Sequence, residues 1–463
     1  MCLRNVEGAW GERSLLATPT VFGKTRGMHR VALPLWLVWC VGVCAQPQID
    51  PHIARVIAET KAIDNHAHPM RATAAGEEDT DWDQIPSDVE PFTMPVRMRP
   101  DNPEWLGAWR ALYGYKYGDA SSPHLAELAA RRNEVRAAKG DGYPAWVLDK
   151  VGTETMLANR AAMGRGLTPP RFRWVSFVDT LAFPLDNSRA ASYSPDRKVY
   201  FGDLARLFHR YLAARHLAKI PESLDDYLRV VITPALEEQK AAGALAIKFE
   251  GAYLRSLEFT NPARSEAAAV YGRYAQGGAP EPNEYKVLQD YIYRYMAREA
   301  GRLKLAVHIH TGAGVGAWFD QAGAQPILLS SLFDDPELRE TNFVMLHAAW
   351  PYPEVVATML SKPNVYADIS AMTFLLYPPR LAQSIRTWLE YQPEKVLFGT
   401  DAFPLGSTGW EDMAWLTAHT GREAVGIALT IMLHDGTTSP ARADELARAV
   451  LRENAARLYH LKD

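Results

Sequence analysis

Ala62-Ile63-Asp64-Asn65-His66-Ala67-His68 is the stretch from which the fold is best predicted. It begins apolar and ends in two histidines that are separated by one residue. On an extended strand, residues two apart point to the same side. Both imidazoles can therefore reach one metal ion from a single short segment. The question for the remaining chain is which other side chains reach the same ion.

Seven further segments have the composition of buried strands, and helical segments separate them. Each is short and nearly continuously apolar, which is typical of a parallel sheet covered on both faces. The predicted strands are 62–68, 154–159, 172–180, 244–249, 303–310, 342–347, 365–369 and 396–400. Eight such units predict an α/β fold, a (β/α)8 TIM barrel. In that fold, functional residues lie at the C-terminal ends of the strands.

Residues 71–142 interrupt this alternation after the first strand. They are polar, with helical patterning at 102–115 and 124–138 and a loop predicted at 74–91. We expect a helical insertion over the barrel mouth, acting as a lid or as a contact surface. Residues 46–463 are then a single barrel domain, which closes with a periodic amphipathic helix over 441–459.

The first 45 residues have the pattern of a leader. An apolar run at 31–44 follows Lys24, Arg26 and Arg30. Its length suits the core of a secretory signal better than a membrane span. Cleavage after Ala45 would give a periplasmic or secreted product without a stable membrane span; an uncleaved anchor is the alternative. Met28 is an alternative start, which would make residues 1–27 an extension.

Cysteine and charge content narrow the chemistry of residues 46–463. All three cysteines, Cys2, Cys40 and Cys44, lie in the leader. Without disulfides or thiolates, a metal must be held by His, Asp, Glu or Lys. Residues 46–463 carry 45 Lys/Arg against 52 Asp/Glu, with no basic stripe. This argues against nucleic acid as a partner and leaves a small molecule as the expected one.

Titratable side chains gather at the predicted strand ends. Five of the thirteen histidines lie at the tips of three strands. The strand ends carry His66 and His68, Lys248 and Glu250, His308 and His310, His347, Asp368 and Ser370, and Asp401. Imidazole together with carboxylate suits zinc, with manganese or iron as alternatives. A packing role is the alternative for each histidine, and it is the expectation for His308, which lies one layer deeper than His310.

This arrangement resembles the amidohydrolase superfamily, which has His-x-His after the first strand, His after the fifth and sixth, and Asp after the eighth. The stretches VHIHTGAG (307–314), MLHAAWPYPE (345–354), NVYADIS (364–370) and VLFGTDAFP (396–404) resemble its amidohydrolase-related branch, amidohydrolase 2. They are most similar to the amidohydrolase domain fused to glutamine synthetase. The resemblance covers about residues 50–462 and implies a barrel of the metal-dependent hydrolase type.

The resemblance also implies a role for several strand-end residues. His66, His68, His310 and Asp401 would bind the metal. Asp401 would in addition take a proton from a water whose pKa a bound metal can lower to about 7. His347 would lie beside that water, where it binds substrate or carries protons.

Lys248 is open to two interpretations. In members of the superfamily with two metals, a carboxylated lysine at this position bridges them. The branch that the chain resembles usually holds one metal, so we expect one and favour Lys248 as a cation for a substrate carboxylate. Tyr253 and Arg255 resemble an Ala-Tyr-Arg stretch of the glutamine-synthetase-fused branch, although Leu254 intervenes. With Trp318 as a pocket wall, they are the predicted substrate-binding residues.

The expected activity is metal-dependent hydrolysis of an amide, isopeptide, lactone or other ester bond in a small carboxylated molecule. A γ-glutamyl amide would be consistent with the nearest resemblance. Two alternatives stay open: a non-oxidative decarboxylase on the same site, and a non-catalytic binding protein on the same barrel. Related barrels often pair, so a homodimer is one expected arrangement.

Overall fold

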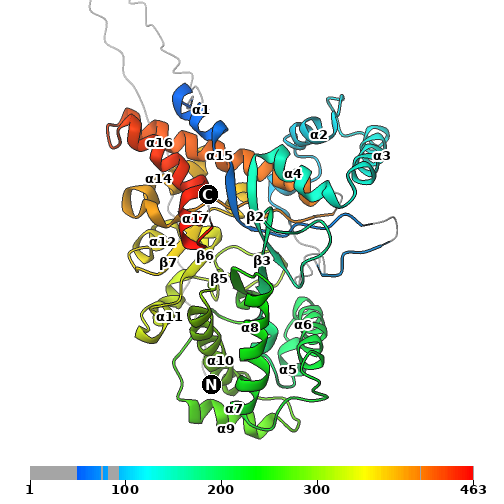
Figure 1. The fold of residues 1–463 in the computed structure, drawn as a ribbon, viewed down its shortest axis with the longest axis vertical. Helices are drawn as coiled ribbons and strands as arrows, with labels where there is room; N and C mark the ends of the chain where they lie inside the picture. The colour runs from blue at the N-terminus through cyan, green and yellow to red at the C-terminus, as the bar shows by residue number, and fades with distance from the viewer. Residues whose placement is uncertain (1–48, 74–76, 82–92, 407, 462–463) are drawn as a thin grey trace, which may run out of the picture. The chain divides into compact units, whose positions relative to one another are not determined.

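Eight parallel strands form one sheet, and each strand pairs with the next along the chain (Figure 1). The computed structural model describes residues 49–73, 77–81, 93–406 and 408–461. The strands are β1 (Ala62–Ala67), β2 (Thr153–Arg160), β3 (Phe172–Phe177), β4 (Ala246–Phe249), β5 (Ala306–His310), β6 (Phe343–Leu346), β7 (Val365–Asp368) and β8 (Val396–Leu397). The predicted α/β barrel is confirmed, with every predicted strand present.

The segment after β8 closes the barrel against β1. Asp401 N donates to His66 O at 2.7 Å, and His68 N donates to Ala402 O at 2.8 Å. Regular pairing of β8 stops at Leu397, before the predicted end at residue 400. The strand ends early because the backbone turns there, and Asp401 has a φ of 53°. These bonds place the functional end of β8 directly beside the His-x-His segment.

Helices follow the strands and cover the outside of the sheet (Figure 1). They are α1 (Pro51–Glu59), α2 (Trp105–Tyr113), α3 (Ser122–Lys139), α4 (Tyr143–Val151), α5 (Ser188–Ala191), α6 (Pro195–Ala213), α7 (Leu224–Tyr227), α8 (Thr233–Ala241), α9 (Arg264–Tyr274), α10 (Pro282–Leu303), α11 (Ser330–Phe333), α12 (Pro353–Met359), α13 (Met372–Leu375), α14 (Pro378–Tyr391), α15 (Trp410–His434), α16 (Pro440–Arg448) and α17 (Asn454–Leu458). Local sequence explains their starts: Asp50, for example, caps α1 by accepting from His52 N and Ile53 N, and Pro51 occupies the first turn.

The described residues between β1 and β2 include three α-helices. α2 and α3 lie within residues 71–142, and α4 follows them. α2 and α4 pack on α15. Arg132 and Arg136 of α3 pair with Asp412 and Glu411 in the first turn of α15. Part of the predicted loop at 74–91 lies outside the described residues.

The C-terminal helix fills the barrel at the end away from the functional strand tips. The predicted helix over 441–459 is α16, a π-helical turn (Ala449–Glu453) and α17, in succession. Leu458 and Tyr459 pack against apolar side chains from the strands, among them Ile63, Leu157 and Val344. This packing brings the last residues of the chain to the layer below the strand-end histidines.

The predicted leader, residues 1–45, lies outside the described residues. Within the part of the chain that is described, no helix is both long and apolar enough to cross a membrane.

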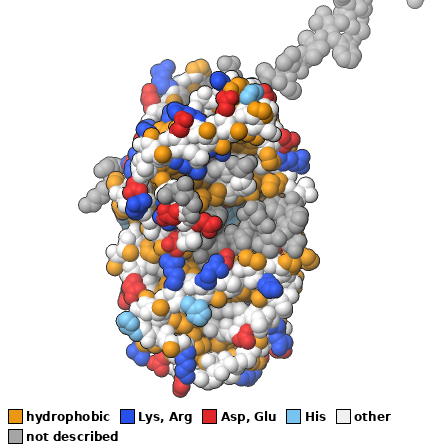
Figure 2. Space-filling view, turned by 90° about the vertical axis from the view of Figure 1, so that its right-hand side faces the viewer, with side chains coloured by type: hydrophobic (Ala, Val, Ile, Leu, Met, Phe, Trp, Pro, Cys, Tyr) orange, Lys and Arg blue, Asp and Glu red, His pale blue; other side chains and the backbone are white. Residues whose placement is uncertain are grey.

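On the face shown in Figure 2, Lys and Arg side chains are interspersed with Asp and Glu side chains.

Candidate metal centre and pocket

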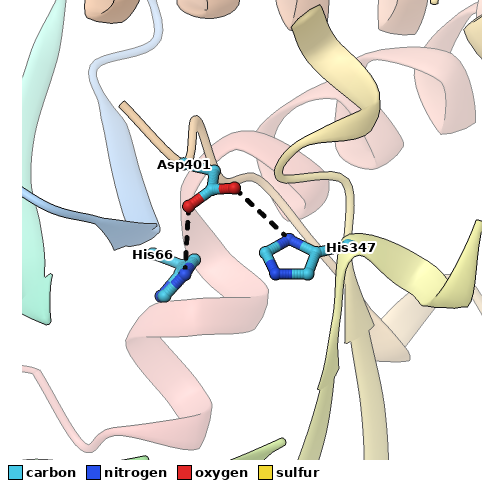
Figure 3. A group of neighbouring side chains, drawn as sticks. All are labelled: His66, His347 and Asp401. Carbon is cyan, nitrogen blue, oxygen red and sulfur yellow. Dashed lines mark ion pairs between the residues drawn. The ribbon is translucent and has the colours of Figure 1, made fainter. Parts of the chain in front are cut away.

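Three buried side chains from different strands meet at the barrel mouth. Potential ligand atoms of His66, His347 and Asp401 all lie within 4.8 Å of one another. The Asp401 carboxylate lies between the two rings (Figure 3), with Oδ1 at 3.2 Å from His66 Nε2 and Oδ2 at 3.7 Å from His347 Nδ1. The ends of β1, β6 and β8 therefore converge on one point.

His68 and His310 extend this group. His68 Nε2 lies 3.4 Å from Asp401 Oδ1, and His310 Nδ1 lies 3.1 Å from His347 Nε2. All five residues that the sequence assigned to the metal or its water are thus neighbours. The cluster differs from the predicted ligand set in one respect. His347 lies with His66 and Asp401 in the compact group of potential ligand atoms, whereas His310 contacts that group through His347.

Left-handed backbone surrounds the site. Positive φ angles occur at His347 (65°), Ala348 (38°), Ala349 (48°), Ala371 (56°) and Asp401 (53°). This conformation costs about 1–2 kcal/mol for a residue with a Cβ, so the surrounding packing must impose it. Such strain is typical of functional sites. Here it turns the chain sharply just after β6, β7 and β8, where the side chains of the site are placed.

Burial determines the charge of the histidine imidazoles in this cluster. It holds the pKa of His66 and of His310 well below the ordinary value, and the nearby Lys248 ammonium adds to the effect. Burial also lowers the pKa of His347. At neutral pH the imidazoles are therefore uncharged and keep a lone pair for a metal.

Asp401 is ionised in the same surroundings. Burial opposes its charge, but the imidazoles of His347, His66 and His68 outweigh burial and hold the pKa of Asp401 well below its usual range. The site therefore combines a carboxylate with neutral imidazoles. That is the donor set of zinc and of similar divalent ions in proteins.

Two ring nitrogens show that these residues fit a metal. His66 Nδ1 and His310 Nε2 are buried, and among the described residues neither has a hydrogen-bond partner. A buried polar atom left without a partner costs about 1–3 kcal/mol. A divalent ion or a bound substrate would satisfy such atoms. The residues present thus suit a metal, with His66 and Asp401 as the nearest holders and His68, His310 and His347 beside them.

Asp368, at the end of β7, fixes the orientation of His347. Its carboxylate accepts from His347 N at 2.8 Å, from Ser370 Oγ at 2.6 Å and from Asn65 Nδ2 at 2.7 Å. Ser370 Oγ also lies 2.9 Å from His347 Nδ1. Because the hydroxyl proton of Ser370 goes to Asp368, His347 Nδ1 must donate to Ser370. His347 Nε2 then carries the lone pair.

Tyr459 continues this chain of hydrogen bonds below the site. Its hydroxyl donates to Asn65 Oδ1 and lies 2.7 Å from His308 Nε2. Since the single phenolic proton goes to Asn65, His308 donates from Nε2. Burial lowers the pKa of His308 to about 3, so the ring is neutral. His308 thus bonds to the C-terminal helix one layer below the metal group, as expected from its position.

Lys248 forms an ion pair that the sequence interpretation missed. Its Nζ lies 2.8 Å from Glu250 Oε2, and both side chains are buried. Glu250 Oε1 also lies 3.4 Å from His310 Nδ1, and Glu250 N donates to Asp179 Oδ2 at 2.7 Å. Glu250 is therefore a site residue. Glu250 could have been predicted from the sequence by its position two residues after Lys248 at the end of the same strand.

The three predicted substrate-binding residues separate in space. Tyr253 lines the pocket, and its ring centroid lies 4.6 Å from that of His310. Arg255 turns away after the buried Leu254 and pairs with Asp290 at 2.5 Å. Trp318 is 53% exposed and does not belong to the pocket lining. Of the three, only Tyr253 stands where the sequence placed it.

A pocket opens onto this cluster, and its empty space of about 590 Å³ includes open solvent at the mouth. Its lining has a polar part and an apolar part, which together consist of His66, His68, Lys248, Glu250, Tyr253, His310, Ala313, Gly314, Val315, His347, Ala371, Phe374, Leu375, Asp401 and Phe403.

Solved structures with folds similar to this chain include two isomerases and one candidate hydrolase. A Thermotoga maritima uronate isomerase matches 89% of this chain and 98% of its own, with 13% identity and a TM-score of 0.61. A Caulobacter crescentus glucuronate isomerase matches 89% and 93%, with 14% identity and a TM-score of 0.59. A Lactobacillus casei protein described as a candidate metal-dependent hydrolase matches 90% and 100%, with 16% identity and a TM-score of 0.57. At these identities the likeness establishes the fold alone.

Sequence comparison identifies the family. No curated protein matches the chain. Residues 196–461, more than half of the chain, match the sequence model of the Amidohydrolase family. This matched region contains β4 to β8, with Lys248, His310, His347 and Asp401 at the ends of its strands. On this evidence the chain belongs to the amidohydrolase family.

Proposed function

We propose that the protein is a metal-dependent hydrolase that cleaves an amide, isopeptide, lactone or other ester bond in a small molecule. The ionised Asp401 carboxylate, held among neutral imidazoles that line a pocket, carries this proposal. A bound divalent ion would activate water and polarise the substrate carbonyl. Zinc suits the donor set best, with Mn²⁺ or Fe²⁺ as alternatives.

Asp401 is the proton carrier of the proposed reaction. Its carboxylate is ionised, and it can accept a proton as water oxygen bonds to the carbonyl carbon. The bond from carbon to the leaving nitrogen or oxygen then breaks, and Asp401 returns the proton to that atom. The products are a carboxylic acid and an amine or alcohol. His347 lies beside Asp401, and its hydrogen bonds to Asp368 and Ser370 fix its orientation. Its Nε2 lone pair faces His310.

The ion pair of Lys248 favours one metal over two. A lysine that bridges two metals carries a carboxylate on Nζ, whereas here Nζ lies 2.8 Å from the Glu250 carboxylate. Two carboxylates at that distance would repel each other in a buried site. The pairing supports Lys248 as an ammonium.

The resemblance to the glutamine-synthetase-fused branch keeps a γ-glutamyl amide among the proposed substrates. Export to the periplasm or outside the cell remains a proposal that rests on the apolar run at 31–44. N-terminal sequencing of the mature protein tests the export proposal, since cleavage would leave Gln46 as the first residue. Homodimerisation is likewise proposed, and sedimentation of the purified protein tests it.

Isotope labelling tests the reaction class. Zinc-reconstituted protein is incubated in H₂¹⁸O with aryl esters, lactones and N-acyl amino acids, and product carboxylates are analysed by mass spectrometry. We expect one ¹⁸O atom for each bond cleaved, and loss of this labelling in Asp401→Asn. Release of CO₂ from aromatic carboxylic acids without ¹⁸O uptake would establish the decarboxylase instead. A protein that holds no stoichiometric metal, and in which His66→Ala changes no measured property, would be the binding protein.

A further inference from the structure

Apolar side chains from three loops build one part of the pocket. Phe374 and Leu375 come from α13 after β7, Phe403 follows β8, and Val315 follows β5. The rings of Phe374 and Phe403 meet edge to face, with centroids 5.7 Å apart. Both are at least nine-tenths buried although they line a cavity. Phe403 lies two residues after Asp401, so this apolar part begins next to the proposed reaction centre.

Tyr253 contributes its ring to the same pocket. Its hydroxyl accepts from Val315 N at 3.2 Å, which ties the phenolic oxygen to the loop after β5. The ring centroid lies 4.6 Å from that of His310 and 4.8 Å from that of Phe319. Aromatic groups favour such edge-to-face neighbours. Tyr253 therefore adds an aromatic ring to the pocket lining beside His310, and Phe319 packs against that ring from outside the lining.

The permanent cations near the pocket are already paired. Among the described residues of the lining, Lys248 is the only Lys or Arg, and its ammonium lies 2.8 Å from Glu250. Arg255, a predicted substrate-binding residue, pairs with Asp290. A carboxylate brought to Lys248 would compete with Glu250 and leave a buried acid without its cation. The lining thus suits a substrate that carries no charge on the part away from the bond to be cleaved.

We propose that the substrate is an aromatic acyl compound, whose ring packs against Phe374, Phe403 and Tyr253 while its carbonyl reaches the Asp401 group. This inference rests on the proposed function and names the substrate class of the same site. It replaces the carboxylated substrate expected from the sequence, the γ-glutamyl amide included, by an aryl-substituted ester, lactone or amide. Burial of the aromatic ring supplies the binding energy, and Asp401 carries the proton at the bond to be cleaved.

Hydroxamates test the proposal by binding alone, because they place a metal-chelating carbonyl group next to a variable substituent. Isothermal titration of zinc-reconstituted protein compares benzohydroxamate, acetohydroxamate and the carboxylated succinic monohydroxamate. Burial of the ring predicts that benzohydroxamate binds about 10- to 100-fold more tightly than acetohydroxamate. Equal affinity for the two, or tightest binding of the carboxylated probe, would overturn the proposal.

Variants locate the ring. Phe374→Ala and Phe403→Ala should each reduce the preference for benzohydroxamate at least about threefold, with acetohydroxamate affinity and zinc content little changed; Phe374→Leu and Phe403→Leu serve if the alanine variants do not fold. Tyr391→Ala removes a ring that is 60% exposed on α14 and should leave the preference unchanged. If both phenylalanine variants keep the preference for benzohydroxamate over acetohydroxamate, the ring does not bind against Phe374 and Phe403. A benzohydroxamate preference without ¹⁸O uptake refutes the hydrolase only, and ¹⁸O uptake without the preference refutes this inference only.

Discussion

Removing the hydroxyl of Tyr459 tests whether the C-terminal helix supports the metal group. In Tyr459→Phe, the ring stays buried in the barrel, but Asn65 Oδ1 loses its donor and His308 Nε2 loses its acceptor. Both atoms belong to fully buried side chains. Each buried polar group without a partner costs about 1–3 kcal/mol. The substitution should therefore lower the free energy of unfolding by about 2–6 kcal/mol.

Thermal unfolding measures this loss. A domain of roughly 420 residues has an unfolding entropy of about 0.9 kcal/mol/K, so the predicted loss lowers Tm by about 2–7 °C. Tyr271→Phe is the matched control, because that buried tyrosine donates a single hydrogen bond, to Pro221 O at 2.8 Å. It should cost about 1 kcal/mol, or about 1 °C. A Tm for Tyr459→Phe no lower than that of Tyr271→Phe would refute the reasoning.

The other predictions concern the proton carrier, a buried ion pair and pH. Asp401→Asn should lower kcat about 10²- to 10⁴-fold while the histidines retain much of the metal; complete loss of metal in elemental analysis would contradict its role as proton carrier. Arg160→Met removes the guanidinium 2.8 Å from the buried Asp79 but leaves Arg71 at 3.3 Å, so thermal unfolding should show a loss of about 1–3 kcal/mol. Burial beside Glu411 raises the pKa of Asp412 to about 7. The unfolded pKa is 3.8, so the stability from the protonated form is complete below pH 4 and lost as pH rises through 7. The Tm of Asp412→Asn minus that of the wild type should therefore increase between pH 6 and 8, and a constant difference would contradict the assignment.

The barrel and its metal group could be predicted because both follow from short-range pattern and from the fold. Each strand is apolar enough to be recognised alone, and a parallel barrel brings all C-terminal strand ends to one mouth. His66, His68, His310, His347 and Asp401 therefore had to be neighbours once eight strands were recognised. Their order around the metal depends on side-chain orientation, and the sequence contains no signal for that.

Two features could not be predicted because their partners are distant in the sequence. Tyr459 meets Asn65 from 394 positions away, and the helical periodicity of the last segment shows only that it has an apolar face. The direction of Arg255 depends on the turn at Gly251–Tyr253 and on the burial of Leu254, which carry its side chain to Asp290 instead of the pocket. A local sequence match could suggest that Arg255 binds substrate, but it could not show where its guanidinium points.

Glu250 is different, because the rule that identified the metal ligands applies to it as well. His66 and His68 were recognised since residues two apart at a strand end share a side. Lys248 and Glu250 have the same spacing at the end of β4, so an ammonium and a carboxylate at that spacing predict an ion pair. Pairing them changes the interpretation of the pocket: Lys248 is no longer available to a substrate carboxylate, and a second metal loses its bridging ligand. The single-metal site and the uncharged aromatic substrate are thus two consequences of one contact, and Glu250→Gln tests both. If Lys248 is released by that substitution, the affinity for succinic monohydroxamate should rise, whereas an unchanged affinity would show that the ion pair does not control the charge of the pocket.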